Sequence, residues 1–205
     1  MNSQMIPAII VRYFQEVFRS MKRITFNSPV VLGFAIISAI ALAMNIVTNG
    51  YTNMMFFSVY KSSWTDPLAY LRIFTHVLGH ASISHYANNM VLFLLVGPLL
   101  EEKYGSSRLF SIIATVALVT GLVHILLPGN SALLGASGVI FAFILLSSVT
   151  GDGKGIPLTM IIVALIYISQ QIYEGVTVAD NISQLTHIIG GSIGAVYGLA
   201  LRGRK

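Results

Sequence analysis

The chain has 205 residues, of which 55% are hydrophobic and 9% charged, and its mean hydropathy is +0.80. Soluble domains carry about 25% charged residues, so this composition excludes a soluble globular protein and predicts that most of the chain lies in a membrane. The net charge of +5 comes from basic residues at the ends of apolar runs, with no basic patch interleaved with aromatic residues, and this excludes nucleic acid as an expected partner.

Residues 1–28, which precede the first long apolar run, contain four basic residues among apolar ones: Arg12, Arg19, Lys22 and Arg23. This alternation predicts a cytoplasmic segment whose amphipathic helix lies on an anionic membrane surface, and a solvated helix packed on the protein fits it equally well. The segment lacks the pattern of a cleavable signal peptide and the features of a mitochondrial presequence. We therefore expect the plasma membrane of a prokaryote as the location.

Six long apolar runs follow, and each predicts a transmembrane helix because a helix needs about 20 residues to cross a bilayer. The runs cover residues 29–47, 86–100, 109–127, 138–149, 156–172 and 185–201. The second and fourth runs are short, so we expect them to extend into flanking residues such as 83–85 and 133–137. The predicted fold is an all-α integral membrane bundle of six helices over residues 29–201, followed by a basic cytoplasmic tail at 202–205.

The connections between the runs predict the topology. The longest, residues 48–84, is too polar to span and too rich in apolar residues to be a plain linker, so we expect it to be partly embedded. With the N-terminus in the cytoplasm, the inner segments hold ten of the 12 basic residues, and the outer ones hold Lys61 and Arg72. Cytoplasmic segments carry the excess of basic residues, so both termini are predicted to be cytoplasmic. The second, fourth and sixth helices then begin on the outer side.

Four polar residues in or beside these runs are functional candidates, because polar groups in a span cost free energy. His85 and Asn89 are four residues apart at the start of the second helix, hence on one face. Ser137 opens the fourth helix, and His187 lies in the first turn of the sixth. All four are predicted at a similar depth in the outer leaflet, which indicates one site. Taken singly, each also fits a role in helix packing.

This set of side chains can support acyl transfer. A serine hydroxyl is a weak nucleophile until a base removes its proton, and His187 would serve Ser137 as that base. The tetrahedral intermediate needs donors for its oxyanion, which His85, the Asn89 amide and the Ser137 backbone N–H could supply. Glycines could bring these two helices together, because small residues allow helices to approach closely. In the sixth helix Gly190, Gly194 and Gly198 recur every fourth residue on the face of His187, and in the fourth helix Gly138 follows Ser137.

The same residues resemble the motifs of the rhomboid family of intramembrane serine proteases. The segment Gly135-Ala136-Ser137-Gly138 is similar to the GxSG nucleophile motif, His187 with Gly190 and Gly194 to the HxxGxxxG base motif, and His85 with Asn89 to the HxxxN oxyanion element. The stretch 72–85 resembles the entrance to the second helix, and Glu101 followed by Gly105 resembles its acidic end. GxSG alone is also found in other hydrolases, whereas three ordered motifs are specific. The likeness covers residues 72–198.

The resemblance implies a six-helix fold and a Ser-His dyad, Ser137 and His187, that works without an acid, a metal or a cofactor. It implies hydrolysis of a peptide bond in or near the transmembrane segment of a membrane protein substrate. Its supporting residues are Gly135, Gly138, Phe141, Gly190, Gly194, His76, His80, Arg72 and Glu101. Two positions depart from the family pattern: Leu71 replaces the tryptophan that often precedes the arginine, and Phe141 replaces the tyrosine that often stacks on the base.

Several alternatives remain open. His76 and His80 could bind a metal with His85, but HExxH and cysteine are absent, which favours a polar network beneath the first loop. Glu101 is far from Ser137, which favours an ion pair with Lys103 or Arg108 over an acid role. The whole protein could also be a catalytically silent rhomboid-like protein that binds transmembrane clients, or a small transporter. The presence of both dyad residues argues against the first, and the lack of an inverted repeat against the second.

Overall fold

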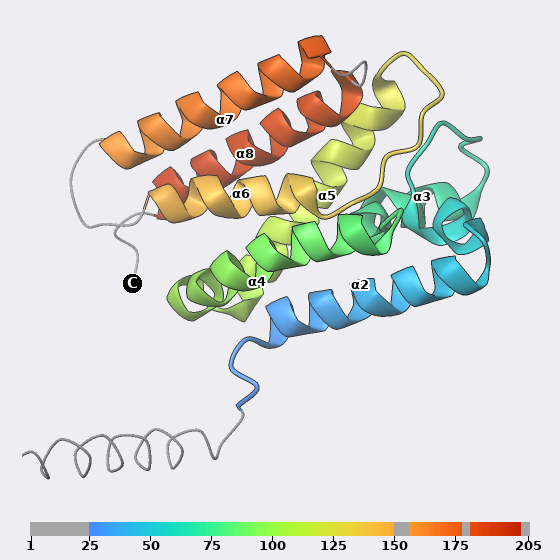
Figure 1. Ribbon diagram of the computed structural model, residues 1–205, viewed down its shortest axis with the longest axis horizontal. Coiled ribbons are helices and arrows are strands. Elements are labelled where there is room, and N and C mark those ends of the chain that lie inside the picture. Colours follow the sequence, from blue (N-terminus) through green and yellow to red (C-terminus); the bar gives the residue numbers. More distant parts are fainter. Residues whose placement is uncertain (1–24, 150–155, 178–180, 202–205) are drawn as a thin grey trace, which may run out of the picture.

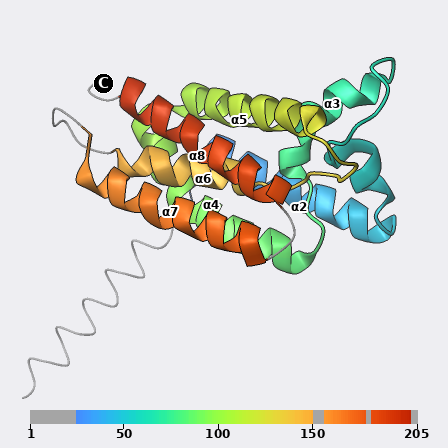
Figure 2. The same ribbon diagram turned by 90° about the horizontal axis from the view of Figure 1, so that it is seen from above.

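The computed structural model describes residues 25–149, 156–177 and 181–201, so the predicted N-terminal helix and basic tail lie outside the described residues. The fold is all-α, as predicted. Its helices are α2 (Pro29–Val47), α3 (Pro67–Thr75), α4 (Ile83–Tyr104), α5 (Ser106–Leu126), α6 (Ser137–Ser148), α7 (Leu158–Thr177) and α8 (Asn181–Leu201), with the short turns η1 (Asn53–Phe57) and η2 (His76–Leu78) before α4. The N-terminal ends of α4, α6 and α8 lie at the end of the bundle that carries α3 (Figures 1 and 2).

Four described segments are long and apolar enough to cross a membrane: Pro29–Val47, Ile83–Tyr104, Ser106–Leu126 and Gln184–Leu201. The apolar parts of α6 and α7 are shorter. The second predicted run does extend to Ile83, whereas the fourth does not extend into residues 133–136. Gly135 stops that extension because its φ of 129° is incompatible with an α-helix. The connection between the fifth and sixth predicted runs is also partly helical, because α7 ends at Thr177 and α8 begins at Asn181, so His187 lies deeper in its helix than the predicted first turn.

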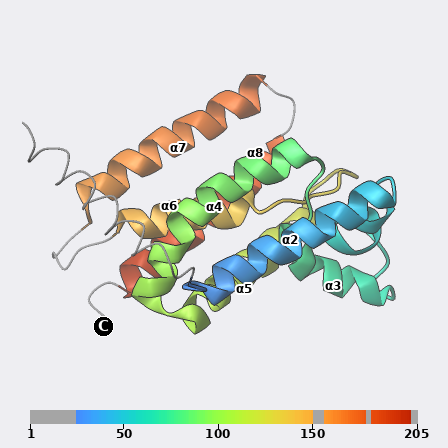
Figure 3. The ribbon, with the colours of Figure 1, turned by 60° about the horizontal axis from the view of Figure 1, so that its bottom comes forward.

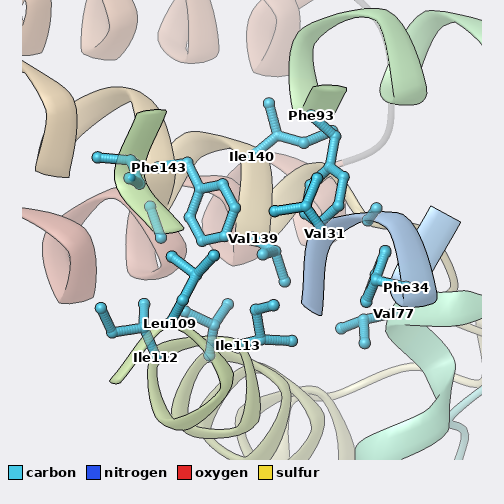
Figure 4. Close-up of a cluster of buried hydrophobic side chains, with 14 of the residues drawn as sticks. Val31, Phe34, Val77, Phe93, Leu109, Ile112, Ile113, Val139, Ile140 and Phe143 are labelled. Carbon is cyan, nitrogen blue, oxygen red and sulfur yellow. The ribbon is translucent and has the colours of Figure 1, made fainter. Parts of the chain in front are cut away.

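The core lies between α2, α4, α5 and α6, and aromatic rings fill its centre (Figure 4). The Phe93 ring lies 4.6 Å from that of Phe34 and 5.3 Å from that of Phe143, measured between ring centroids. Lipid is as apolar as these side chains, so their contribution comes from close packing and not from removal of water. Because α6 is surrounded by other helices, it contacts protein along most of its length and need not match the thickness of the bilayer.

The closest helix pair is α6 and α8, and glycine makes this approach possible. A Cβ atom on Gly190 would lie 2.2 Å from the carbonyl oxygen of Gly138, and one on Gly194 would lie 2.0 Å from that of Ala142. No side chain can be accommodated at such distances. The two helices therefore touch backbone to backbone, which brings the first turn of α6 beside the middle of α8.

Glu101, near the end of α4, binds the first turn of α2. Its carboxylate accepts hydrogen bonds from the backbone N–H groups of Val30 and Val31, both at 3.0 Å, and from Ser106 Oγ at 2.7 Å. The first N–H groups of a helix have no partner within it, and the helix dipole favours an anion there. The expected ion pair with Lys103 or Arg108 is therefore replaced by a cap on α2.

Candidate active site

Ser137 is the first residue of α6, and the loop before it is held by the first connection. The N–H of Gly135 donates to the carbonyl of His76 at 2.9 Å, and Val59 and Leu133 exchange two backbone hydrogen bonds of 2.9 Å. Gly135 adopts a φ of 129°, which side chains rarely allow. This backbone turn leaves Ser137 at the start of a helix, where free N–H groups favour negative charge.

His187 reaches Ser137 across the interface of α6 and α8. The distance between His187 Nε2 and Ser137 Oγ is 2.7 Å, which is a short hydrogen bond. In a neutral ring an unprotonated Nε2 accepts the serine proton, which is the arrangement of a nucleophile and its base. The structure therefore brings together two residues that are 50 positions apart in the sequence.

His85 and Asn89 lie on one face of α4 and are directed at Gly135. A Cβ atom on Gly135 would lie 3.0 Å from His85 Nε2 and 3.8 Å from Asn89 Nδ2. The N–H of Ala81 donates to His85 Nδ1 at 3.4 Å, so in a neutral ring the proton is on Nε2 and faces this loop. The geometry thus gathers N–H donors beside the residues that precede Ser137.

The amide of Asn89 is buried, and its Nδ2 has no hydrogen-bond partner among the described residues. Leaving a buried donor unsatisfied costs about 1–3 kcal/mol, so such a group calls for an explanation. A donor held ready for a negative charge that forms only during a reaction is one explanation. This is the donor that the sequence predicts for an oxyanion.

Three rings from three helices form an aromatic stack, His187, Phe141 and Tyr167. The Phe141 centroid lies 4.9 Å from that of His187 and 4.1 Å from that of Tyr167. Phe141 therefore contacts the candidate base as the resemblance implies, even without a hydroxyl. Tyr167 was missed by sequence reasoning, although a tyrosine within an aliphatic run is a detectable signal because its ring is both large and polar.

His76 and His80 lie beside the site and are held by the protein. His76 Nδ1 donates to the carbonyl of Ile73 at 3.0 Å, and His76 Nε2 lies 3.3 Å from Thr120 Oγ1. The backbone carbonyl of His80 accepts a hydrogen bond from Asn53 Nδ2 at 2.9 Å. Burial lowers the pKa of each ring to about 4, so both are neutral near pH 7. Within residues 25–149, 156–177 and 181–201, no cluster of three metal-binding side chains is present.

Arg72 organises the first connection at a distance from Ser137. Its guanidinium donates to the carbonyl of Met55 at 3.3 Å, to Ser62 Oγ at 3.0 Å and to Asp66 Oδ2 at 2.6 Å, and it lies 4.5 Å from the centroid of the Tyr60 ring. The hydrogen bond from Arg72 holds the pKa of the Asp66 carboxyl below its usual value. Arg72 therefore joins η1 to α3, and His76, the residue that caps the end of α3, binds the loop before Ser137 through the N–H of Gly135.

Residues 67–204 match the Rhomboid domain family, and a search of curated proteins gave no match. The matched region is more than half of the chain and contains every residue of the candidate site, from His85 on α4 to His187 on α8. Four membrane-length helices accompany it. The chain therefore belongs to the rhomboid family, and it is a multi-pass membrane protein.

Proposed function

We propose that the protein is an intramembrane serine endopeptidase that cleaves transmembrane protein substrates in or near their membrane segments. The observation that carries the proposal is the 2.7 Å hydrogen bond between His187 Nε2 and Ser137 Oγ, next to the unsatisfied amide of Asn89. Members of the rhomboid family are usually intramembrane proteases, which adds support. A silent client-binding protein would need neither the short hydrogen bond nor the oxyanion donors.

The proposed reaction has two halves. Ser137 Oγ attacks the carbonyl carbon of the scissile bond while its proton passes to His187 Nε2, and the negative charge on the carbonyl oxygen is met by His85, Asn89 and the Ser137 N–H. The C–N bond then breaks, and His187 gives its proton to the leaving amine. Water, deprotonated by the same His187, attacks the acyl-enzyme and releases the carboxylate with Ser137 restored.

We propose that the site opens toward the extracytoplasmic side, within the outer leaflet, and that both termini are cytoplasmic. The excess of basic residues in the opposite segments supports this orientation. With 12 residues, α6 is about 18 Å long, well short of a hydrocarbon layer of about 30 Å. Ser137 at its start is then below the membrane surface, where a wet cavity is needed to supply water.

A helical substrate keeps its carbonyl groups in hydrogen bonds, and these bonds must break before Ser137 can attack. Residues that weaken a helix, above all glycine and proline, make this opening less costly. We therefore expect substrates to carry such residues near the cleaved bond and to approach the site sideways from the lipid. The substrate class is thus a membrane helix with a locally weak segment.

A serine-reactive fluorophosphonate tests the proposal on the detergent-solubilised protein. We expect covalent labelling at Ser137, located by peptide mass spectrometry, because the base within hydrogen-bond distance raises the reactivity of this hydroxyl. Ser148→Ala is the matched control on the same helix, since Ser148 Oγ donates to the Leu145 carbonyl at 2.7 Å and no histidine among the described residues binds it. Labelling that persists in Ser137→Ala, or its complete absence from the folded wild type, would contradict the proposal and favour a silent rhomboid-like protein.

Asn89→Ala is expected to lower kcat about 100-fold with KM nearly unchanged, because an oxyanion donor acts on the transition state and not on bound substrate. Cleavage of a reporter transmembrane substrate over a range of concentrations measures both constants. The neighbouring Asn88→Ala is the control, since Asn88 is exposed. An increase in KM at constant kcat would mean that Asn89 binds substrate and is no oxyanion donor.

A further inference from the structure

On the side of the bundle formed by α7, the ring of Tyr167 contacts Phe141 of the candidate site. In Figures 1 and 3 this helix lies along one edge of the bundle, opposite α2, and among the described elements it contacts only α6 and α8. Many of its exposed side chains are aliphatic, such as Leu165 and Ile166. Among the α7 side chains that the structure describes, Tyr167 alone is buried, with 6% of its surface exposed.

The buried ring of Tyr167 is enclosed by the other two helices. It lies against Phe141 on α6, with the ring centroids 4.1 Å apart, and a Cβ atom on Gly191 of α8 would lie 3.1 Å from Tyr167 Cε1. Glycine at this position thus leaves room for the ring. A cavity of about 100 Å³ borders Tyr167 between α6, α7 and α8, so the ring is a buried contact of α7 beside a gap in the packing.

The aromatic stack runs from Tyr167 through Phe141 to the candidate base. Phe141 contacts both Tyr167 and His187, and in each contact the rings are tilted relative to one another. His187 must keep Nε2 within hydrogen-bond reach of Ser137 Oγ, a distance of 2.7 Å here. If Tyr167 were removed, Phe141 could turn away and the imidazole would lose the surface that orients it.

We infer that Tyr167 is a positioning residue for His187, acting through Phe141, so that the docking of α7 controls the reactivity of Ser137. The inference rests on the proposed function of Ser137 and His187. If α7 acted only as a barrier, its displacement would change the entry of transmembrane substrates from the lipid but not the reaction of Ser137 with small water-soluble reagents. A positioning role for Tyr167 predicts that the reactivity of Ser137 changes toward both. Any displacement of α7 from the bundle lowers the nucleophilicity of Ser137 at the same time as it exposes the edge of the site.

Labelling of Ser137 by a small fluorophosphonate tests the inference in the full-length protein. Tyr167→Leu is expected to lower the maximal labelling rate about 10-fold to 100-fold, because small displacements of a catalytic group have effects of this size. The reagent concentration that gives half the maximal rate is expected to stay unchanged. Tyr167→Phe keeps the ring and is expected to label within about twofold of the wild type. Tyr173→Leu is the matched control on the same helix, since Tyr173 is 69% exposed.

A double-mutant cycle separates positioning from general packing. If Tyr167 acts through Phe141, the double variant Phe141→Leu/Tyr167→Leu labels no more slowly than Phe141→Leu alone. Equal thermal unfolding midpoints of wild type and Tyr167→Leu exclude loss of fold as the cause. A labelling rate of Tyr167→Leu within about twofold of the wild type, or additive losses in the cycle, would overturn the inference. A folded wild type that does not label at all would overturn the proposed function and this inference together.

Discussion

Ser137→Ala and His187→Ala are each expected to lower kcat for a reporter transmembrane substrate by about 10⁴-fold or more, because nucleophile and base act as one unit. Without Ser137 no acyl-enzyme forms, and without His187 the hydroxyl keeps its proton at neutral pH. Cleavage assays in detergent micelles and in liposomes measure the loss. Binding of the reporter, followed with uncleaved substrate, is expected to remain, since neither side chain is needed for affinity.

The non-additivity of the two losses is the sharper test. Once either residue is gone, the second has no partner to act on, so Ser137→Ala/His187→Ala is expected to be no slower than the slower single variant. Thermal unfolding of each variant verifies that the fold is intact. Substantial cleavage by either single variant, or losses that multiply in the double variant, would show that the 2.7 Å hydrogen bond has no catalytic role.

Gly194→Ala is expected to lower the free energy of unfolding by about 3 kcal/mol and to abolish cleavage, since overpacking of a close contact costs this much. The new Cβ would lie 2.0 Å from the carbonyl oxygen of Ala142, so α6 and α8 must separate. The same separation lengthens the distance between Ser137 and His187. Unfolding in mixed micelles with increasing SDS measures the stability, and fluorophosphonate labelling measures the state of the site.

Gly33→Ala is the matched control for this variant. Gly33 is also a helical glycine, but a Cβ there would meet no atom within 4 Å. The substitution is expected to leave stability unchanged or to raise it by up to about 1 kcal/mol through helix propensity. If Gly194→Ala were as stable as Gly33→Ala, backbone contact between α6 and α8 would not be what holds the dyad together.

Much of the fold follows from the sequence because its signals are local. The lengths of the apolar runs predict the membrane-spanning helices, and α2 begins at Pro29 and ends at Val47 as expected. The glycine period predicts which helix can approach α6 closely, and the structure shows that contact at Gly190 and Gly194. The residues proposed for the site, Ser137 and His187, were selected because polar groups are costly in lipid.

Other features depend on contacts between distant segments, and sequence spacing cannot reveal these. Glu101 was expected to pair with a nearby basic residue, but its partners are backbone N–H groups at the start of α2. Every helix start offers such groups, so the sequence does not indicate which helix a carboxylate will cap. Tyr167 acquires its place from the packing of α7 on two other helices. The start of the fourth span was predicted too early in the chain, because the backbone of Gly135, and not its apolar surroundings, determines where α6 begins.

The cap on α2 also bears on how the chain is assembled during synthesis. The N–H of Val31 is bound by a carboxylate that lies 70 residues further along the chain. When α2 first enters the membrane, its leading N–H groups therefore have water or lipid head groups as partners. They exchange these partners for Glu101 only after α4 has been made and inserted. The first membrane helix is thus fastened by the next one, and nascent chains that end before residue 101 carry α2 without this attachment.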